Sequence, residues 1–313
     1  MWPISLFFSF FMILGIFLML SSLNWMSIWV GLELNLFGFL PLMLMPGVSS
    51  TAEASMKYFL VQAFGSGIFL SYSFFSYFFF SSFASLSYLF ILVSLALKVG
   101  LSPFFSWFPH VMVNLSWSNC VILNTLQKIG PILLFSNFFS MNFLIMIMVA
   151  SNAIFGATMG YLQSFIRSIM AYSSMVHLGW ILSIGMISIY ATLTYTLLYF
   201  ILSSCIFIFA ATISSDRWSI FTKMFILVCS LLSLGGLPPL TGFMMKMIGM
   251  VILLKSNLVI LLSLMLLSSI LSIIFYLNLL FFWSSSHKQT KLSVKMFEGI
   301  FLILTTFGLI AIA

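Results

Sequence analysis

The chain has 313 residues, of which 63% are hydrophobic and 5% charged, with eleven Lys and Arg against four Asp and Glu. A soluble domain carries about 25% charged residues, so this composition excludes a soluble protein. The apolar runs are continuous rather than alternating, which favours helices over a β-barrel, and helices of about 20 residues fit about eleven times into the chain. We therefore expect an all-α polytopic membrane protein with about eleven transmembrane helices in a single transmembrane domain over residues 1–313.

Apolar runs separated by helix-breaking residues predict the spans in chain order. The first run has no basic residue before it and no small-residue cleavage site, so we expect a mature helix rather than a signal peptide. The ninth run is too long for one straight crossing. The expected spans are 3–21, 24–45, 55–80, 86–108, 115–137, 141–163, 168–190, 192–213, 220–254, 257–283 and 296–313.

The cations outside the membrane are distributed unevenly. Those in or beside the connections after even-numbered spans outnumber those on the other side seven to one, and only Lys255 lies on the second side. Positive charge marks the cytoplasmic or matrix side, so we expect the N-terminus there and the C-terminus opposite. The seven cations are Lys57, Arg167, Arg217, Lys223, Lys288, Lys291 and Lys295.

The connections are too short to hold a domain, since the longest covers residues 284–295. This excludes nucleotide binding in practice, and a net charge of +7 gathered on one side of a membrane does not indicate a nucleic-acid partner. Gly65 and Gly67 lie in mid-membrane without a third glycine in register, which predicts helix packing rather than a dinucleotide-binding loop. The cysteines form no C-x-x-C pair, so we expect small core residues and no metal site at Cys120, Cys205 and Cys229.

Four charged residues fall inside apolar runs, where each costs roughly 2.5–3.5 kcal/mol at a helix centre. Such groups mark proton or ion pathways in membrane proteins. Burial disfavours the charged form of an amine, a nearby carboxylate favours it, and arginine could not release its proton. Three amines with one carboxylate suit protons better than a hard cation, which prefers several oxygen ligands. The four residues are Glu33, Lys98, Lys128 and Lys246.

Two of these lysines adjoin helix-breaking residues. Proline removes a backbone donor and crowds the preceding turn, so we expect an interrupted helix beside Lys98 and another beside Lys246. Matching interruptions in two halves of a chain indicate an internal repeat with the ion path at the break, whereas a simple proline kink is the alternative. The breaking residues are Gly100 and Pro103 in the first segment and Pro238 and Pro239 in the second.

Six runs of the chain carry a family resemblance. They resemble the chain 2 family of mitochondrial NADH:ubiquinone oxidoreductase (respiratory complex I), an antiporter-like membrane subunit. The resemblance implies an antiporter-like inverted repeat with shortened N-terminal helices, in the mitochondrial inner membrane with the N-terminus in the matrix and the C-terminus in the intermembrane space. The runs are GLELN, EASMKYFLVQA, LKVGLSPFFSWFPHV, LQKIGPI, RSIMAYSSMVHLGW and LGGLPPLTGFMMK.

The same resemblance implies roles for the buried charges. Glu33 and Lys98 correspond to a modulating pair, Lys128 to a central lysine and Lys246 to an exit-side lysine, together relaying protons while quinone reduction elsewhere supplies the energy. His177 also matches and would line the proton path, although a packing histidine near a helix end is the alternative. NADH, FMN, iron–sulfur clusters and ubiquinone would bind to other subunits, with no cofactor and no redox chemistry on this chain.

The expected partners are the other membrane subunits of complex I, including further antiporter-like chains, and membrane lipids. A free-standing cation/proton antiporter is the alternative function, and a structural spacer with relic charges is a third. Among the remaining polar residues, Glu53 and Lys57 are four apart and predict a surface ion pair. His110 and His287 are expected to be loop residues without a role.

Overall fold

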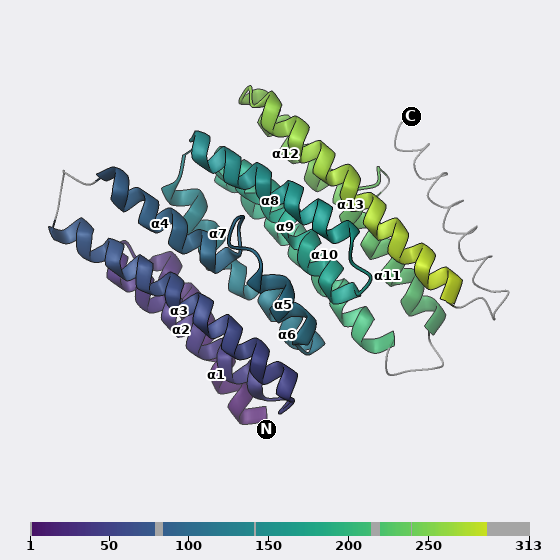
Figure 1. Cartoon of the computed structure of the whole chain (residues 1–313), viewed down its shortest axis with the longest axis horizontal. Coiled ribbons are helices and arrows are strands. Elements are labelled where there is room, and N and C mark those ends of the chain that lie inside the picture. The colour runs from purple at the N-terminus through teal and green to yellow at the C-terminus, as the bar shows by residue number, and fades with distance from the viewer. Residues whose placement is uncertain (1, 79–83, 141, 214–219, 239, 287–313) are drawn as a thin grey trace. The chain divides into compact units, whose positions relative to one another are not determined.

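The computed structural model describes residues 2–78, 84–140, 142–213, 220–238 and 240–286. These residues form helices and contain no strand, which confirms the all-α fold class (Figure 1). The helices are α1 (Trp2–Ser21), α2 (Trp25–Leu44), α3 (Ser49–Phe78), α4 (Ala84–Val99), α5 (Trp107–Asn114), α6 (Trp117–Asn124), α7 (Leu126–Phe138), α8 (Phe143–Tyr161), α9 (Ile166–Gly185), α10 (Ile189–Ile213), α11 (Ile220–Gly235), α12 (Thr241–Lys255) and α13 (Val259–Ser286).

Five of the described helices are individually long and apolar enough to cross a membrane: α1, α2, α8, α10 and α13. Two expected spans, 115–137 and 220–254, are each built from two shorter helices, namely α6 with α7 and α11 with α12. In the expected span 86–108, α4 ends at Val99 and α5 begins only at Trp107, so α5 lies mostly beyond that span. The last expected span, 296–313, lies outside the described residues. The structure therefore confirms a polytopic helical membrane protein, whereas the count of eleven spans stays a prediction.

The chain divides into two compact units. The first comprises Met1–Asn152 with Gly185–Ile189, and the second comprises Ala153–Ile184 with Tyr190–Ala313. Each unit contains one of the two expected interruptions, between α4 and α5 in the first and between α11 and α12 in the second. The expectation of a single domain over residues 1–313 stays a prediction.

Glycines bring α1 and α2 together at backbone distance. A Cβ atom at Gly15 would lie 2.7 Å from the carbonyl oxygen of Gly31, and one at Gly38 would lie 2.8 Å from that of Phe8. Small residues allow such close approach, which drives helix association where lipid removes the usual hydrophobic force. The opposite face of α1 exposes large apolar side chains such as Phe10 and Phe17.

Both expected helix interruptions are present. Helix α4 ends at Val99 and α5 begins at Trp107, with Gly100 at φ +80° directly after the first half-helix. Gly236 occupies the same place after α11, with φ +82°. Only glycine adopts this left-handed conformation without strain, so each glycine ends its half-helix cleanly. Pro103 lies in the first connection and Pro238 in the second, whereas Pro239 lies outside the described residues.

The structure contains a third helix interruption, which the sequence did not predict. The expected continuous span 115–137 is broken at Thr125, whose φ of −113° and ψ of −80° separate α6 from α7. The Thr125 hydroxyl donates to the carbonyl oxygen of Val121 at 2.7 Å, a contact that bends helices. Pro131, inside α7, has no N–H group and weakens the first turns of that helix further.

The contact between α1 and α2 gives a stability prediction. Gly38→Ala inserts a methyl group against the α1 backbone, so we expect overpacking that lowers the unfolding free energy by about 1–3 kcal/mol. Gly67→Ala is the matched control, because a Cβ atom there meets nothing within 4 Å and alanine is the better helix former. Thermal unfolding in mild detergent measures both, and equal stability of the two variants would contradict the prediction.

Candidate functional site

Lys98 and Lys128 line one cavity in the first unit. Its volume, measured as the space open to the centre of a water molecule, is about 20 Å³. About 10–15 Å³ on this scale is enough to hold one water. Polar side chains between the two lysines make the cavity suitable for water. The lining residues are Leu32, Asn35, Leu36, Tyr58, Gln62, Lys98, Val99, Trp107, Phe108, Leu123, Gln127, Lys128 and Pro131.

Lys128 is almost completely buried, with 3% of its surface exposed. It lies in the first turn of α7, and its Nζ donates to Oδ1 of Asn124, the last residue of α6, at 2.9 Å. The same nitrogen lies 4.2 Å from the centre of the Phe108 ring, a cation–π geometry. An amide oxygen and an aromatic face therefore stabilise a proton on this amine.

Lys98 lies in the last turn of α4, with 6% of its surface exposed. Unpaired carbonyl groups and the helix dipole favour a cation at this end of a helix. The side chain passes Gly65 of α3, where a Cβ atom would lie 3.3 Å from Lys98 Cγ. Gly65 thus serves packing as expected, whereas Gly67 faces open space.

Side chains of neighbouring helices satisfy the carbonyl groups that the α4 break leaves free. Gln62 Nε2 donates to the backbone oxygen of Lys98 at 3.2 Å, and Trp107 Nε1 donates to that of Leu97 at 3.2 Å. Inside a membrane, an interruption persists only where such partners exist. The break is therefore a fixed part of the site rather than a plain kink.

Glu33 on α2 is only half-buried, which differs from the expected fully buried carboxylate. The buried face of α2 includes Leu32, Asn35 and Leu36, and Glu33 falls at the edge of that face. Its charge acts on Lys98, but no ion pair links the two among the described residues. Direct pairing of Glu33 with Lys98 stays a prediction.

Gln127, next to Lys128, links two polar side chains of different helices. Tyr58 of α3 donates from its hydroxyl to Gln127 Oε1 at 3.0 Å, and Gln127 Nε2 donates to Asn35 Oδ1 of α2 at 3.1 Å. Tyr58, Gln62 and Asn35 were not among the residues predicted for the site. The spacing of four between Tyr58 and Gln62 is a signal that could have found them, because it places both on one face of a helix.

In the second unit, Lys246 is also buried, with 4% of its surface exposed. It lies on α12, after the break, and its Nζ donates to the backbone oxygen of Gly235, the last residue of α11. Gly236 follows directly, and any side chain there would collide with Lys246. Lys246 thus stands at the carbonyl end of the preceding half-helix.

His177 lies in the middle of α9 rather than near a helix end, and 2% of its surface is exposed. Its Nδ1 lies 3.1 Å from the Tyr195 hydroxyl, with donor and acceptor roles set by the tautomer. Its ring stacks on Tyr199 at 4.8 Å between centroids. These contacts fit both a packing histidine and a proton carrier, so its place in the path stays a prediction.

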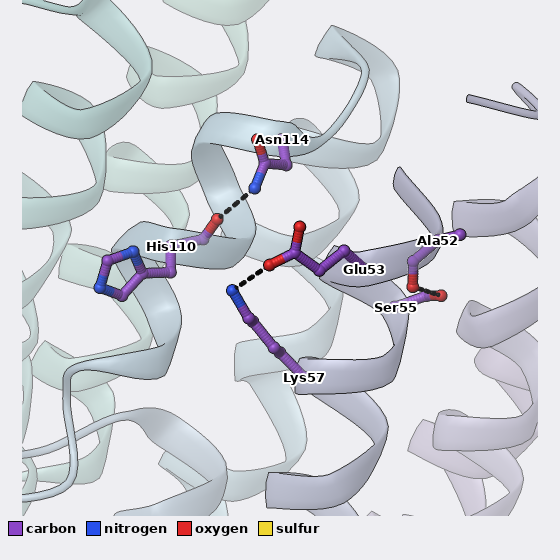
Figure 2. Close-up of polar contacts among 6 residues, drawn as sticks. All are labelled: Ala52, Glu53, Ser55, Lys57, His110 and Asn114. Carbon is purple, nitrogen blue, oxygen red and sulfur yellow. Dashed lines mark hydrogen bonds and ion pairs between the residues drawn. The ribbon is translucent and has the colours of Figure 1, made fainter. Parts of the chain in front are cut away.

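The expected surface pair is confirmed. Lys57 Nζ lies 2.5 Å from Glu53 Oε1, and both side chains are exposed. Figure 2 shows the two side chains pointing toward each other. The hydrogen bond and the charge of Lys57 lower the pKa of the Glu53 carboxyl. His110 lies in α5 and not in a loop, with its carbonyl oxygen accepting from Asn114 Nδ2 at 3.3 Å. His287 lies outside the described residues.

The described residues contain no group of three or more His, Cys, Asp or Glu side chains that could hold a metal ion. Cys120 is buried, as expected of a small core residue, whereas Cys205 and Cys229 are only half-buried. The chemistry that the described groups offer is proton transfer between amines, an imidazole and hydroxyl groups.

Comparisons with known proteins identify the family of the chain. The family model for the transmembrane region of NADH:quinone oxidoreductases and Mrp antiporters matches residues 22–272. The chain is 38% identical over 282 residues to NADH-ubiquinone oxidoreductase chain 2 of Anopheles gambiae, covering 86% of this chain and 82% of that one. It is 34% identical over 283 residues to the chain 2 of Lumbricus terrestris, covering 86% and 83%.

Solved structures share the fold at lower identity. A chain of respiratory complex I from Thermus thermophilus gives a TM-score of 0.79 at 22% identity, covering 88% of this chain and 69% of that one. A chain of the Mrp complex from Dietzia gives 0.75 at 19%, covering 85% and 57%. The match over most of the sequence and the identity to the curated relatives show that the chain belongs to the NADH-ubiquinone oxidoreductase chain 2 family of antiporter-like membrane subunits.

Proposed function

We propose that this chain is a proton-translocating membrane subunit of NADH:ubiquinone oxidoreductase. Lys98, Lys128 and Lys246 relay protons, and quinone reduction elsewhere in the complex supplies the energy. The observation that carries the proposal is the polar cavity shared by Lys98 and Lys128, two buried amines with room for water between them. Membership of the chain 2 family supports the coupling to NADH oxidation.

The cavity suggests how one transfer proceeds. A proton leaves the ammonium of Lys98, passes over water in the cavity and binds the neutral amine of Lys128, where Asn124 and Phe108 stabilise the charge. Amide groups do not exchange protons readily, so Gln127 holds the walls in place while hydroxyl groups and water carry the proton. Glu33 acts on the charge of Lys98 and sets when that amine releases its proton.

The surroundings of the chain follow from the same proposal. It lies in the mitochondrial inner membrane, in contact with lipids and with the other membrane subunits of complex I, including further antiporter-like chains. NADH, FMN, iron–sulfur clusters and ubiquinone bind to other subunits of the complex. The N-terminus faces the matrix and the C-terminus the intermembrane space, as the uneven distribution of cations favours.

A free-standing cation/proton antiporter is the second candidate, because the fold is shared with a chain of an Mrp complex. Identities of 31–38% to curated chain 2 relatives over most of the chain favour the first. The proteins that co-purify in mild detergent separate the two. Flavin and iron–sulfur proteins in the purified assembly would support the oxidoreductase subunit. Cation/proton exchange by the isolated chain in liposomes, without other subunits, would contradict that function.

The first test concerns the central amine. Lys128→Met keeps most of the side-chain volume and removes the proton site, so we expect an assembled complex that pumps fewer protons per NADH oxidised. Proton uptake by sealed vesicles during NADH oxidation is the measurement. Lys255→Met is the matched control, since Lys255 is exposed at the end of α12. Normal pumping by Lys128→Met would support the spacer reading instead.

The second test concerns Glu33. Glu33→Gln removes the charge that acts on Lys98. The substitution should therefore have little effect on the pumping rate of a Lys98→Met variant. Interacting residues show coupling free energies of about 0.5–3 kcal/mol in such double-mutant cycles. Glu53→Gln, which breaks only an exposed ion pair, should leave pumping unchanged. Fully additive effects of Glu33→Gln and Lys98→Met would rule out the modulating pair.

The third test concerns orientation. Val48→Cys and Val259→Cys each place a thiol at an exposed position in a connection or at a helix start. In mitochondria stripped of the outer membrane, a membrane-impermeant thiol reagent should label Val259→Cys at once. Val48→Cys should react only after the inner membrane is opened. The reverse order of labelling would invert the proposed topology.

A further inference from the structure

Three tyrosines of the second unit are completely buried and have no part in the proton path described so far. Tyr195 and Tyr199 lie on α10 and Tyr276 lies on α13, each with 0% of its surface exposed. The spacing of four places the two α10 residues on one face. A phenolic hydroxyl is both a donor and an acceptor, so a buried tyrosine can pass a proton on without keeping a charge.

Tyr195 makes direct contact with the histidine of α9. Its hydroxyl lies 3.1 Å from Nδ1 of His177, and the His177 ring stacks on Tyr199. Tyr199 and Tyr276 both lie close enough to act electrostatically on the Tyr195 hydroxyl. The His177 imidazole thus contacts two hydroxyl-bearing side chains of α10.

Tyr276 has an unusual hydroxyl. It is buried and makes no hydrogen bond of ordinary geometry, which in a folded protein requires an explanation. It lies beside Ser173, one helical turn before His177. The Ser173 hydroxyl donates to the backbone oxygen of Met170 at 3.0 Å, so Ser173 has no proton to offer the Tyr276 oxygen. A hydroxyl with an open acceptor position is ready to receive a proton.

The Tyr276 ring also reaches the broken helix. A Cβ atom at Gly235 would lie 3.5 Å from Tyr276 Cδ2, so the ring packs directly on this glycine. The backbone oxygen of Gly235 accepts the hydrogen bond from Lys246 Nζ. The buried tyrosines therefore contact His177 on one side and, on the other, the glycine whose carbonyl oxygen binds Lys246.

We propose that Tyr195 and Tyr276 carry protons between His177 and Lys246. The proposal rests on the proposed function and extends it to residues on α10 and α13. A proton on His177 Nδ1 moves to the Tyr195 oxygen as the original Tyr195 proton leaves towards Tyr276. Tyr276 takes it up and releases its own, through intervening water, to the neutral amine of Lys246. Each N–H or O–H bond that breaks is matched by one that forms, and both tyrosines end neutral.

The test uses variants that remove only the hydroxyl. Tyr276→Phe and Tyr195→Phe keep both rings, so we expect normal assembly of the complex with a loss of pumped protons per NADH comparable to that of Lys246→Met. The remaining pumping should show a larger solvent deuterium isotope effect, because proton transfer then limits the rate. Tyr190→Phe is the control, since that side chain is 82% exposed.

The outcomes separate the two levels of the proposal. If both hydroxyl variants pump like the parent while Lys246→Met does not, the tyrosine relay is wrong and the proposed function stands. If Lys246→Met also pumps normally, the proposed function itself fails. If one variant does not assemble, the other decides. Failure of both to assemble would make these hydroxyls structural and would overturn the relay.

Discussion

The hydrogen-bond demand of backbone groups within a membrane governs the whole arrangement. A helix that stops there exposes carbonyl oxygens which neither lipid nor bulk water can satisfy. In the second unit the Lys246 amine donates a hydrogen bond to one of these oxygens, that of Gly235. In the first unit Gln62 and Trp107 do so for the carbonyl groups at the end of α4. The interruption and the polar side chains therefore require each other.

The two broken helices reach a similar result by different routes. Lys98 belongs to the half-helix before its break, whereas Lys246 belongs to the half-helix after its break. Lys98 nevertheless lies in the last turn of its half-helix, and the Lys246 amine binds the last residue of α11, so both lie near a carbonyl end, where the dipole stabilises a cation. Lys128 differs, because a side-chain amide and an aromatic ring surround it. Three amines in three environments can hold a proton with unequal strength, which a directional relay needs.

The features that composition and backbone chemistry dictate could be predicted from the sequence. The membrane class follows from the apolar composition, and both breaks beside Lys98 and Lys246 follow from Gly and Pro chemistry. The break at Thr125 could not be predicted from the sequence, because a threonine bends a helix only when its hydroxyl turns to the backbone. The half-burial of Glu33 also depends on how neighbouring helices pack.

The polar network around Gln127 lay beyond the sequence for a related reason. Asn, Gln and Tyr recur at many positions of this chain, and only the fold decides which of them face one another. Tyr58 and Asn35 are 69 and 92 residues from Gln127, respectively, a separation across which no periodicity carries information. The lysines were detectable because a charge in an apolar run is costly by itself, whereas a neutral amide there is inconspicuous.

Gln127 also has a mechanical consequence. It is bonded to side chains of α2 and α3, and its amide nitrogen lies 3.4 Å from Met12 Sδ of α1. A rotation of α7 would have to break all three contacts together, so α7 is held in place against α1, α2 and α3. Movement at the neighbouring ammonium is then confined to its flexible methylene stem, and proton transfer here becomes a swing of one side chain inside a rigid frame.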